Sequence, residues 1–111
     1  MSSMFPRKDW AGVQRRALSP TEVVTRLAAV SGWQLVGQDA GVAIEKTFRF
    51  AAYHETLAFV NAVGFIAQVQ DHHPELTVGY AHCAVRWNTH DVGGLSATDF
   101  ECAQRVDALL A

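Results

Sequence analysis

Three histidines lie in two short polar segments of a kind that can perform proton transfer. His72 and His73 belong to the run Asp-His-His-Pro-Glu at residues 71–75, and His90 lies within Thr-His-Asp at residues 89–91. Imidazole has an ordinary pKa that lets it both accept and donate a proton near neutral pH. Pro74 restricts the residue before it to extended backbone, which suits an imidazole held at the end of an element. The two segments together predict an acid–base site.

Three helices are expected from caps and apolar periodicity. A capping box at residues 19–22, with proline at the first helical position, begins a helix that runs to about residue 30. Residues 53–70 carry a broad apolar stripe that includes Leu57 and leads directly into the histidine pair. Ser96 is the expected N-cap of the last helix, with Asp99 at its third helical position, and its apolar stripe is Phe100, Ala103, Val106 and Leu110.

Four strands are expected between these helices. They fall at residues 33–36, 42–50, 76–80 and 83–89, and the last two form a hairpin that turns at residues 81–82. The order is therefore helix, two strands, helix, two strands, helix, with a short turn within each strand pair. This order predicts an α+β fold in which three helices pack on one face of a four-stranded antiparallel sheet. The open sheet edges favour a homodimer or homotetramer.

Length, composition and net charge limit the classes of protein to which this chain can belong. The 111 residues suit one domain, which we place at residues 18–111 after a flexible N-terminal arm at residues 1–17, with an organelle transit peptide as the alternative for the arm. A net charge of −2 gives no reason to expect a nucleic-acid partner, and no apolar run approaches a membrane span. Cys83 and Cys102 lack metal-ligand spacing and predict reduced thiols in a cytoplasmic protein, with a disulfide as the alternative.

From residue 18 to about residue 110, the sequence resembles the pterin-4a-carbinolamine dehydratases, also called 4a-hydroxytetrahydrobiopterin dehydratases. The family pattern is His-His-Pro, then an aromatic residue, a histidine ten positions later and an aspartate after that. Tyr80, His90 and Asp99 fill the last three places. The neighbouring matches are Phe-Arg-Phe at 48–50, Val-Gly-Tyr at 78–80, Trp-Asn-Thr-His-Asp at 87–91 and Gly-Leu-Ser at 94–96.

The resemblance implies a hydro-lyase that removes water from 4a-hydroxytetrahydropterin to give quinonoid dihydropterin in tetrahydrobiopterin recycling. It implies His72, His73 and His90 as the catalytic set, and we expect His72 and His90 to transfer protons while His73 binds and orients the pterin. The other expected substrate-binding residues are Gln68, Pro74, Glu75 and Asp99. The resemblance also implies no cofactor or metal, and a functional link to an aromatic amino acid hydroxylase.

Two positions depart from the family pattern. Many members have glutamate four residues before the first histidine, where this chain has Gln68, and tryptophan after the Pro-Glu pair, where it has Leu76. Glutamine can hydrogen-bond a pterin but carries no charge, and leucine removes an aromatic wall. Neither departure changes a histidine.

Other interpretations of the same residues remain open. In one alternative, Asp99 has no catalytic role and serves as a capping carboxylate of the last helix. His54, in the first turn of its helix, and His82, at the hairpin tip, are expected to be solvated, and Tyr80 and Trp87 can be packing residues. A zinc site formed by His72, His73, His82 and His90 is a further alternative.

A non-catalytic binding module on the same fold is the alternative function. Some members of the family stabilise the dimer of a homeodomain transcription factor, and some relatives act as assembly factors. Such a module would keep the fold but would not need the three histidines.

Overall fold

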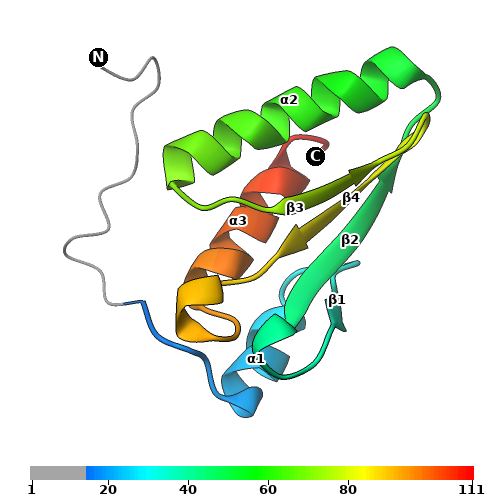
Figure 1. The fold of residues 1–111 in the computed structure, drawn as a ribbon. Helices are drawn as coiled ribbons and strands as arrows, with labels where there is room; N and C mark the ends of the chain where they lie inside the picture. The colour runs from blue at the N-terminus through cyan, green and yellow to red at the C-terminus, as the bar shows by residue number, and fades with distance from the viewer. Residues whose placement is uncertain (1–14) are drawn as a thin grey trace, which may run out of the picture.

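Helices and an antiparallel sheet form the molecule in the computed structural model, which describes residues 15–111 (Figure 1). The helices are α1 (Pro20–Leu27), α2 (Tyr53–Gln70) and α3 (Ala97–Ala108), with short 3-10 helices η1 (Asp39–Gly41) and η2 (His90–Val92). The strands are β1 (Gln34–Val36), β2 (Ala43–Arg49), β3 (Glu75–Val78) and β4 (His82–Trp87), and they form one sheet in the order β1-β2-β4-β3. The predicted α+β fold and element order are confirmed.

The core lies between the sheet and the two longer helices. Side chains alternate along β4, so that Cys83, Val85 and Trp87 are fully buried while their neighbours are half-buried. They pack in one cluster with Ile44 and Phe48 of β2 and with apolar residues of α2 and α3. Both cysteines are buried, and burial raises the pKa of the Cys83 thiol. β4 is thus one of the two central strands of the sheet, and its buried face packs against the helices.

The predicted capping box starts α1. The Ser19 side chain accepts from the Glu22 backbone N–H, the Glu22 carboxylate accepts from the Ser19 N–H, and Pro20 occupies the first turn. Arg16 makes two further bonds to Glu22, of 2.8 and 2.6 Å. These donors, Arg16 first, lower the pKa of Glu22 to about 2. The helix ends at Leu27, before the expected residue 30.

Two expectations about buried side chains were wrong. Leu57 is 40% exposed, and Thr56 beside it is fully buried, because the Thr56 hydroxyl donates to the Tyr80 carbonyl at 2.9 Å across to the β3–β4 hairpin. Leu110 is 56% exposed, because α3 ends at Ala108 before a further turn could bring that residue back to the core. A polar anchor buries Thr56 in place of Leu57, and the length of α3 leaves Leu110 exposed. Neither factor is visible in apolar periodicity.

The β3–β4 hairpin turns earlier than expected. The turn occupies residues 79–81, so His82 is the half-buried first residue of β4, paired with Arg49, and not the solvated tip. The Gly79 N–H donates to the His82 carbonyl at 2.8 Å, and a Cβ added to Gly79 would lie 2.1 Å from the His82 ring. A side chain at position 79 would therefore displace the His82 imidazole from its place.

Candidate functional site

The backbone turn at the end of α2 directs the His72 side chain into the protein. Asp71 caps the helix in the left-handed conformation, with φ 50° and ψ 45°, which aspartate tolerates better than most residues. The His72 N–H then donates to the Ala67 carbonyl at 3.1 Å, and the residue is only 6% exposed. His73, the next residue, is exposed, and β3 begins after Pro74. The adjacent histidines thus point to different environments.

A buried carboxylate holds the His72 ring. Nε2 of His72 lies 2.6 Å from Oδ1 of Asp99, a fully buried residue in the first turn of α3. The other Asp99 oxygen, Oδ2, accepts from the Thr89 hydroxyl at 2.7 Å and from the Ser96 backbone N–H at 2.9 Å. The Thr89 and Ser96 hydroxyls are themselves 2.6 Å apart. Asp99 is therefore both the predicted helix-capping residue and the partner of a candidate catalytic histidine.

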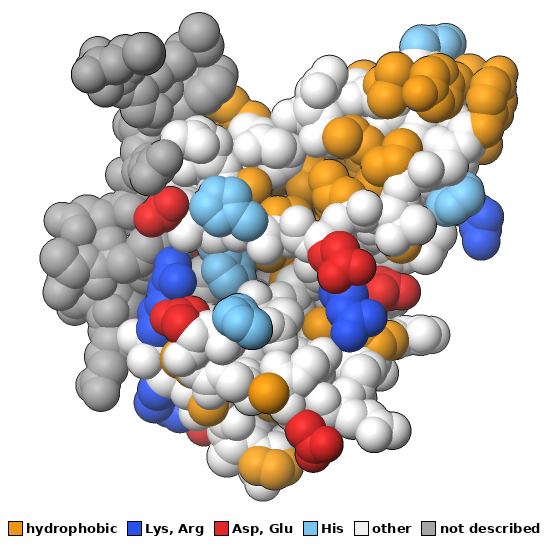
Figure 2. Space-filling model, viewed as in Figure 1, with side chains coloured by type: hydrophobic (Ala, Val, Ile, Leu, Met, Phe, Trp, Pro, Cys, Tyr) orange, Lys and Arg blue, Asp and Glu red, His pale blue; other side chains and the backbone are white. Residues whose placement is uncertain are grey.

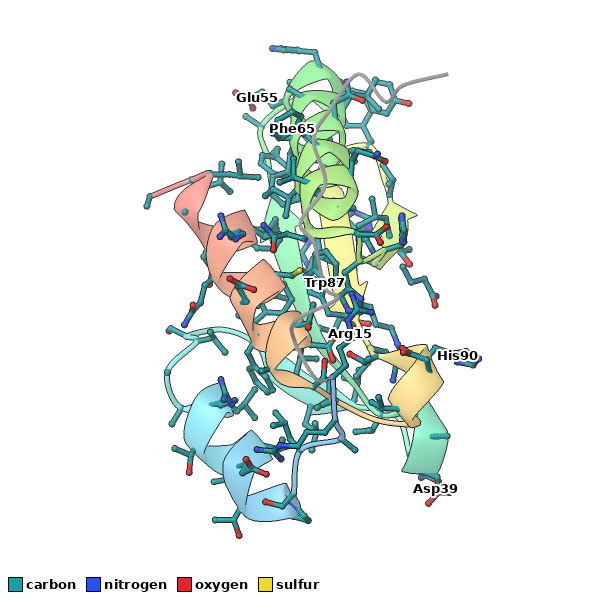
Figure 3. All side chains as sticks on the ribbon, turned by 90° about the vertical axis from the view of Figure 1, so that its left-hand side faces the viewer. Arg15, Asp39, Glu55, Phe65, Trp87 and His90 are labelled. Atoms are coloured by element: carbon teal, nitrogen blue, oxygen red, sulfur yellow. The ribbon has the colours of Figure 1, made fainter. Side chains whose placement is uncertain are left out.

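Trp87 supports the His72 ring from one side. The two rings are stacked, with centroids 5.5 Å apart and an interplanar angle of 11°. Trp87 is fully buried and lies inside the molecule, as Figure 3 shows. The stack limits tilting of the imidazole, while the bond to Asp99 limits its rotation in the ring plane. His72 is thus held in one orientation.

His90 is the first residue of η2, three residues after Trp87 at the end of β4. Its side chain is exposed and points away from the molecule in Figure 3. The preceding residue, Thr89, is the same residue that bonds Asp99, so His90 is one residue from the buried cluster. Histidine side chains gather with acidic and basic groups on the face seen in Figure 2. The structure thus brings the two histidine segments of the sequence to one region.

The other predicted site residues surround this region in different ways. Gln68 is half-buried in the last turn of α2, Pro74 is half-buried, and Glu75 is exposed on β3. Asp99 has no exposed surface, so it reaches the site through His72. Within residues 15–111, no group of three or more histidine, cysteine, aspartate or glutamate side chains is placed to hold a metal ion.

Sequence reasoning missed the roles of Thr89, Ser96 and Trp87. The signal for Thr89 was present, because it continues the buried alternation of Cys83, Val85 and Trp87 with a polar group. A hydroxyl at a buried position needs a hydrogen-bond partner. Ser96 was expected only as an N-cap, and the Trp87–His72 stack had no signal in the sequence.

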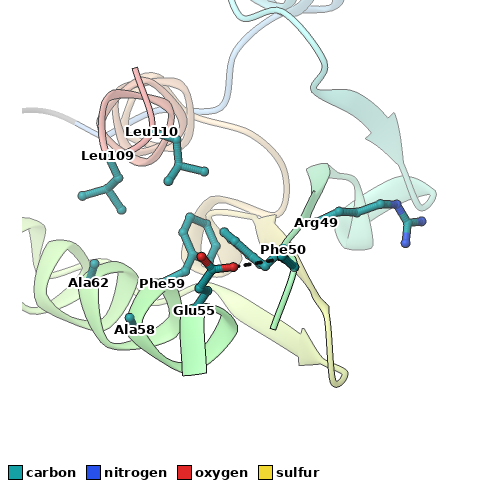
Figure 4. Close-up of a pocket in the computed structure, with 9 residues that line it drawn as sticks. Arg49, Phe50, Glu55, Ala58, Phe59, Ala62, Leu109 and Leu110 are labelled. Atoms are coloured by element: carbon teal, nitrogen blue, oxygen red, sulfur yellow. Dashed lines mark hydrogen bonds between the residues drawn. The ribbon is translucent and has the colours of Figure 1, made fainter. Parts of the chain in front are cut away.

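A separate pocket of about 510 Å³, which His72, His73 and His90 do not line, lies between the first half of α2 and the end of the chain (Figure 4). Glu55 at its rim accepts a bond from the Ala51 N–H at 3.1 Å, which satisfies part of its carboxylate. None of the predicted catalytic residues contributes to its lining, which is Arg49, Phe50, Ala51, Glu55, Ala58, Phe59, Ala62, Leu109 and Leu110. This pocket therefore lacks the candidate catalytic histidines.

Fold and site together define a class of protein. A buried histidine–carboxylate pair with exposed histidines close to it in the chain, on an antiparallel sheet covered by helices, can exchange protons with a small organic substrate. The described residues include no helix that is long and apolar enough to cross a membrane.

The chain belongs to the pterin 4 alpha carbinolamine dehydratase family, whose model matches residues 16–109. A Paracidovorax citrulli protein named "Putative pterin-4-alpha-carbinolamine dehydratase" is 66% identical over 110 residues, which are 99% of this chain and 95% of the relative. A protein of the same name from Xanthomonas campestris is 52% identical over 92 residues, covering 83% of this chain and 76% of that one. The family expected from the histidine motifs is confirmed.

Two solved structures share the fold. A transcriptional coactivator/pterin dehydratase from Brucella melitensis matches with a TM-score of 0.80 and 28% identity, over 86% of this chain and 100% of that one. A pterin dehydratase-like protein described as a RuBisCO assembly factor in the alpha-carboxysome matches with a TM-score of 0.60 and 25% identity, over 70% of this chain and 88% of that one. The family fold therefore occurs in relatives described by different functions.

Proposed function

We propose that the protein dehydrates 4a-hydroxytetrahydropterin to quinonoid dihydropterin by histidine acid–base catalysis. The observation that carries the proposal is the buried His72–Asp99 pair beside exposed His73 and His90. Membership in the dehydratase family supports the substrate class and the reaction. A histidine fixed by a buried carboxylate is a costly arrangement for a protein that only needs a stable fold, because each buried polar group requires partners.

The reaction needs two proton transfers, which the histidines can supply. The hydroxyl on C4a leaves as water after it receives a proton, and the proton on N5 of the ring must be accepted. We assign these transfers to His72 and His90, each typically worth about 10² to 10⁴ in rate. Exposed His73 binds and orients the pterin, together with Gln68, Pro74 and Glu75 around it. Asp99 contributes by holding His72.

The test is the dehydration of freshly generated 4a-hydroxytetrahydropterin, followed by ultraviolet absorbance. We expect the wild-type protein to accelerate the reaction and a His72→Ala/His90→Ala double variant to lose that acceleration. His54→Ala is the matched control, because His54 is exposed in the first turn of α2 and outside the site. A folded wild-type protein that does not exceed the buffer-catalysed rate would contradict the proposal. Activity that survives His72→Ala and His90→Ala but not His73→Ala would reverse the roles.

In the cell, the proposed reaction belongs to tetrahydrobiopterin recycling. An aromatic amino acid hydroxylase releases the hydroxylated pterin that the dehydratase consumes, so the two activities belong in one compartment, which we take to be the cytoplasm. The prediction is that cells lacking this protein accumulate the side products of the hydroxylated pterin when a hydroxylase is active.

A second copy of the chain is the partner that we infer for the apolar surface beside β3. β3 is an edge strand of the sheet. Four residues on it or near it are each at least 40% exposed: Tyr53, Leu57, Val78 and Tyr80. Figure 2 shows hydrophobic side chains gathered on this end of the molecule. A strand edge with an adjoining apolar patch suits antiparallel pairing with an identical edge.

The non-catalytic alternative draws on one solved relative, the RuBisCO assembly factor. A binding module does not need His73 and His90 at the surface. It also does not need a carboxylate buried behind His72. Their joint presence here favours the dehydratase. A histidine variant that keeps a binding role but shows no difference from wild type in the dehydration assay would favour the module.

A further inference from the structure

We propose that Thr89 is a positioning residue for the reaction inferred above, and that its hydroxyl fixes the His72 ring with the proton on Nε2. The inference rests on the proposed function for its catalytic meaning, although the placement of the proton follows from the contacts alone. Thr89 is fully buried, and its hydroxyl lies between Asp99 and Ser96.

The direction of each hydrogen bond in the cluster can be worked out. Thr89 has one hydroxyl proton and donates it to Oδ2 of Asp99 at 2.7 Å. Ser96 must therefore donate its own hydroxyl proton to Thr89 across 2.6 Å. The Ser96 backbone N–H is a second donor to the same Asp99 oxygen. Both hydroxyls thus orient their protons toward the carboxylate, which suits its ionised form.

An ionised carboxylate only accepts hydrogen bonds, so the His72 atom facing it must be a donor. That atom is Nε2, at 2.6 Å from Oδ1. In the neutral ring, Nδ1 then carries the lone pair, and it lies on the side of the ring away from the Asp99 contact. Trp87 covers one face of the ring, so we assign the contact with the substrate to the Nδ1 edge. Nδ1 is therefore the atom that we assign to proton exchange with the pterin.

The same residue also sets the start of the segment that carries His90. The Thr89 N–H donates to the Gly94 carbonyl at 2.9 Å, and the Thr89 carbonyl accepts from the Val92 N–H at 3.1 Å. The side chain of Thr89 thus fixes one candidate catalytic histidine while its backbone holds the loop of the other. Loss of the hydroxyl alone should disturb His72 and leave the His90 loop in place.

The experiment compares Thr89→Val, which removes the hydroxyl at nearly constant shape, with Thr89→Ser, which restores it. Long-range ¹H–¹⁵N correlation spectra of the ¹⁵N-labelled protein report which His72 nitrogen carries the proton. Thr89→Val leaves Asp99 with one donor fewer and freer to turn away from His72. We therefore expect it to reduce the fraction of His72 held in the Nε2–H form and to lower kcat about 10- to 100-fold with little change in KM, as for loss of a hydrogen bond to a charged group. Thr89→Ser should recover most of both. Thr47→Val, an exposed threonine on β2, is the matched control.

Unchanged His72 nitrogen shifts and unchanged kcat in folded Thr89→Val would overturn the inference. If Thr89→Val does not fold, Ser96→Ala takes its place, because it removes the donor to Thr89 but keeps the backbone N–H to Asp99. A partial shift of the His72 tautomer then supports the inference, and none contradicts it. The spectra need no turnover, so an inactive wild type would refute the proposed function while the tautomer result stands separately.

Discussion

At the scale of single residues, Asp99 serves two structures with one side chain. Its Oδ2 accepts the Ser96 N–H and so helps to close the first turn of α3, while its Oδ1 holds His72. A buried carboxylate with donors on both oxygens is stabilising only while the donors remain, because an unpaired buried charge is expensive. Stability and the candidate chemistry therefore depend on the same group.

Asp99→Asn tests this dependence. An amide keeps one acceptor oxygen but places N–H protons against either His72 or the Thr89 hydroxyl, so the facing group can no longer donate and must accept instead. We expect the free energy of unfolding to fall by about 1–3 kcal/mol and the dehydration rate to fall about 10²-fold. Urea unfolding and initial rates measure the two effects. Full activity in Asp99→Asn would show that the orientation of His72 is not needed.

At the scale of elements, α1 shows how a local sequence signal becomes a charge-dependent structure. The Ser19–Glu22 capping box satisfies backbone N–H groups at the helix start, and Arg16 adds an ion pair outside it. Both partners are on the surface, so their interaction is screened by salt. The lowered pKa of Glu22 makes this helix start sensitive to acid.

Glu22→Gln separates the cap from the charge, because glutamine can still accept the Ser19 N–H. The folded pKa of Glu22, about 2, lies below its ordinary value of 4.5, so its stabilising effect is complete above pH 4.5 and is lost as the pH falls toward 2. We expect wild type to have the higher urea midpoint at pH 7 and the difference to close over that range. A difference that persists at pH 2, or that resists about 1 M salt, would contradict the ion-pair explanation.

The elements were largely predictable from the sequence, but their mutual contacts were not. The bounds of α2 and the N-caps of α1 and α3 follow from local periodicity and capping, which a single sequence displays. The His72–Asp99 bond joins residues 27 positions apart and depends on where α3 crosses the end of α2. Thr56 replaces Leu57 at the buried position through a bond to the distant hairpin, which no local pattern contains.

At the scale of the whole molecule, the apolar surface beside β3 predicts self-association. Tyr80 is 69% exposed and stacks on Tyr53 with ring centroids 5.6 Å apart, next to β3, which is an edge strand of the sheet formed by residues 15–111. Exposed aromatic residues of this kind are common at the centres of protein interfaces. We expect wild type to sediment as a dimer or tetramer at micromolar concentration.

Tyr80→Glu should shift the sedimentation profile toward single chains, because it places a charge in the middle of the proposed interface. Val24→Glu is the control, since Val24 is an exposed apolar residue of α1, far along the chain from β3. Sedimentation velocity measures both variants beside wild type. A wild-type protein that remains a single chain at micromolar concentration, or equal effects of the two variants, would count against this interface.

Because Asp99 has two roles, it constrains how such a protein can change during evolution. A lineage that no longer needs the chemistry cannot simply discard the carboxylate, because the first turn of α3 uses the same group. Selection for folding alone would preserve aspartate at this position after the reaction had been lost. Aspartate at this position in a distant relative therefore indicates only that the start of the helix is intact. Histidine at position 72 is the better indication that the ancestral chemistry persists.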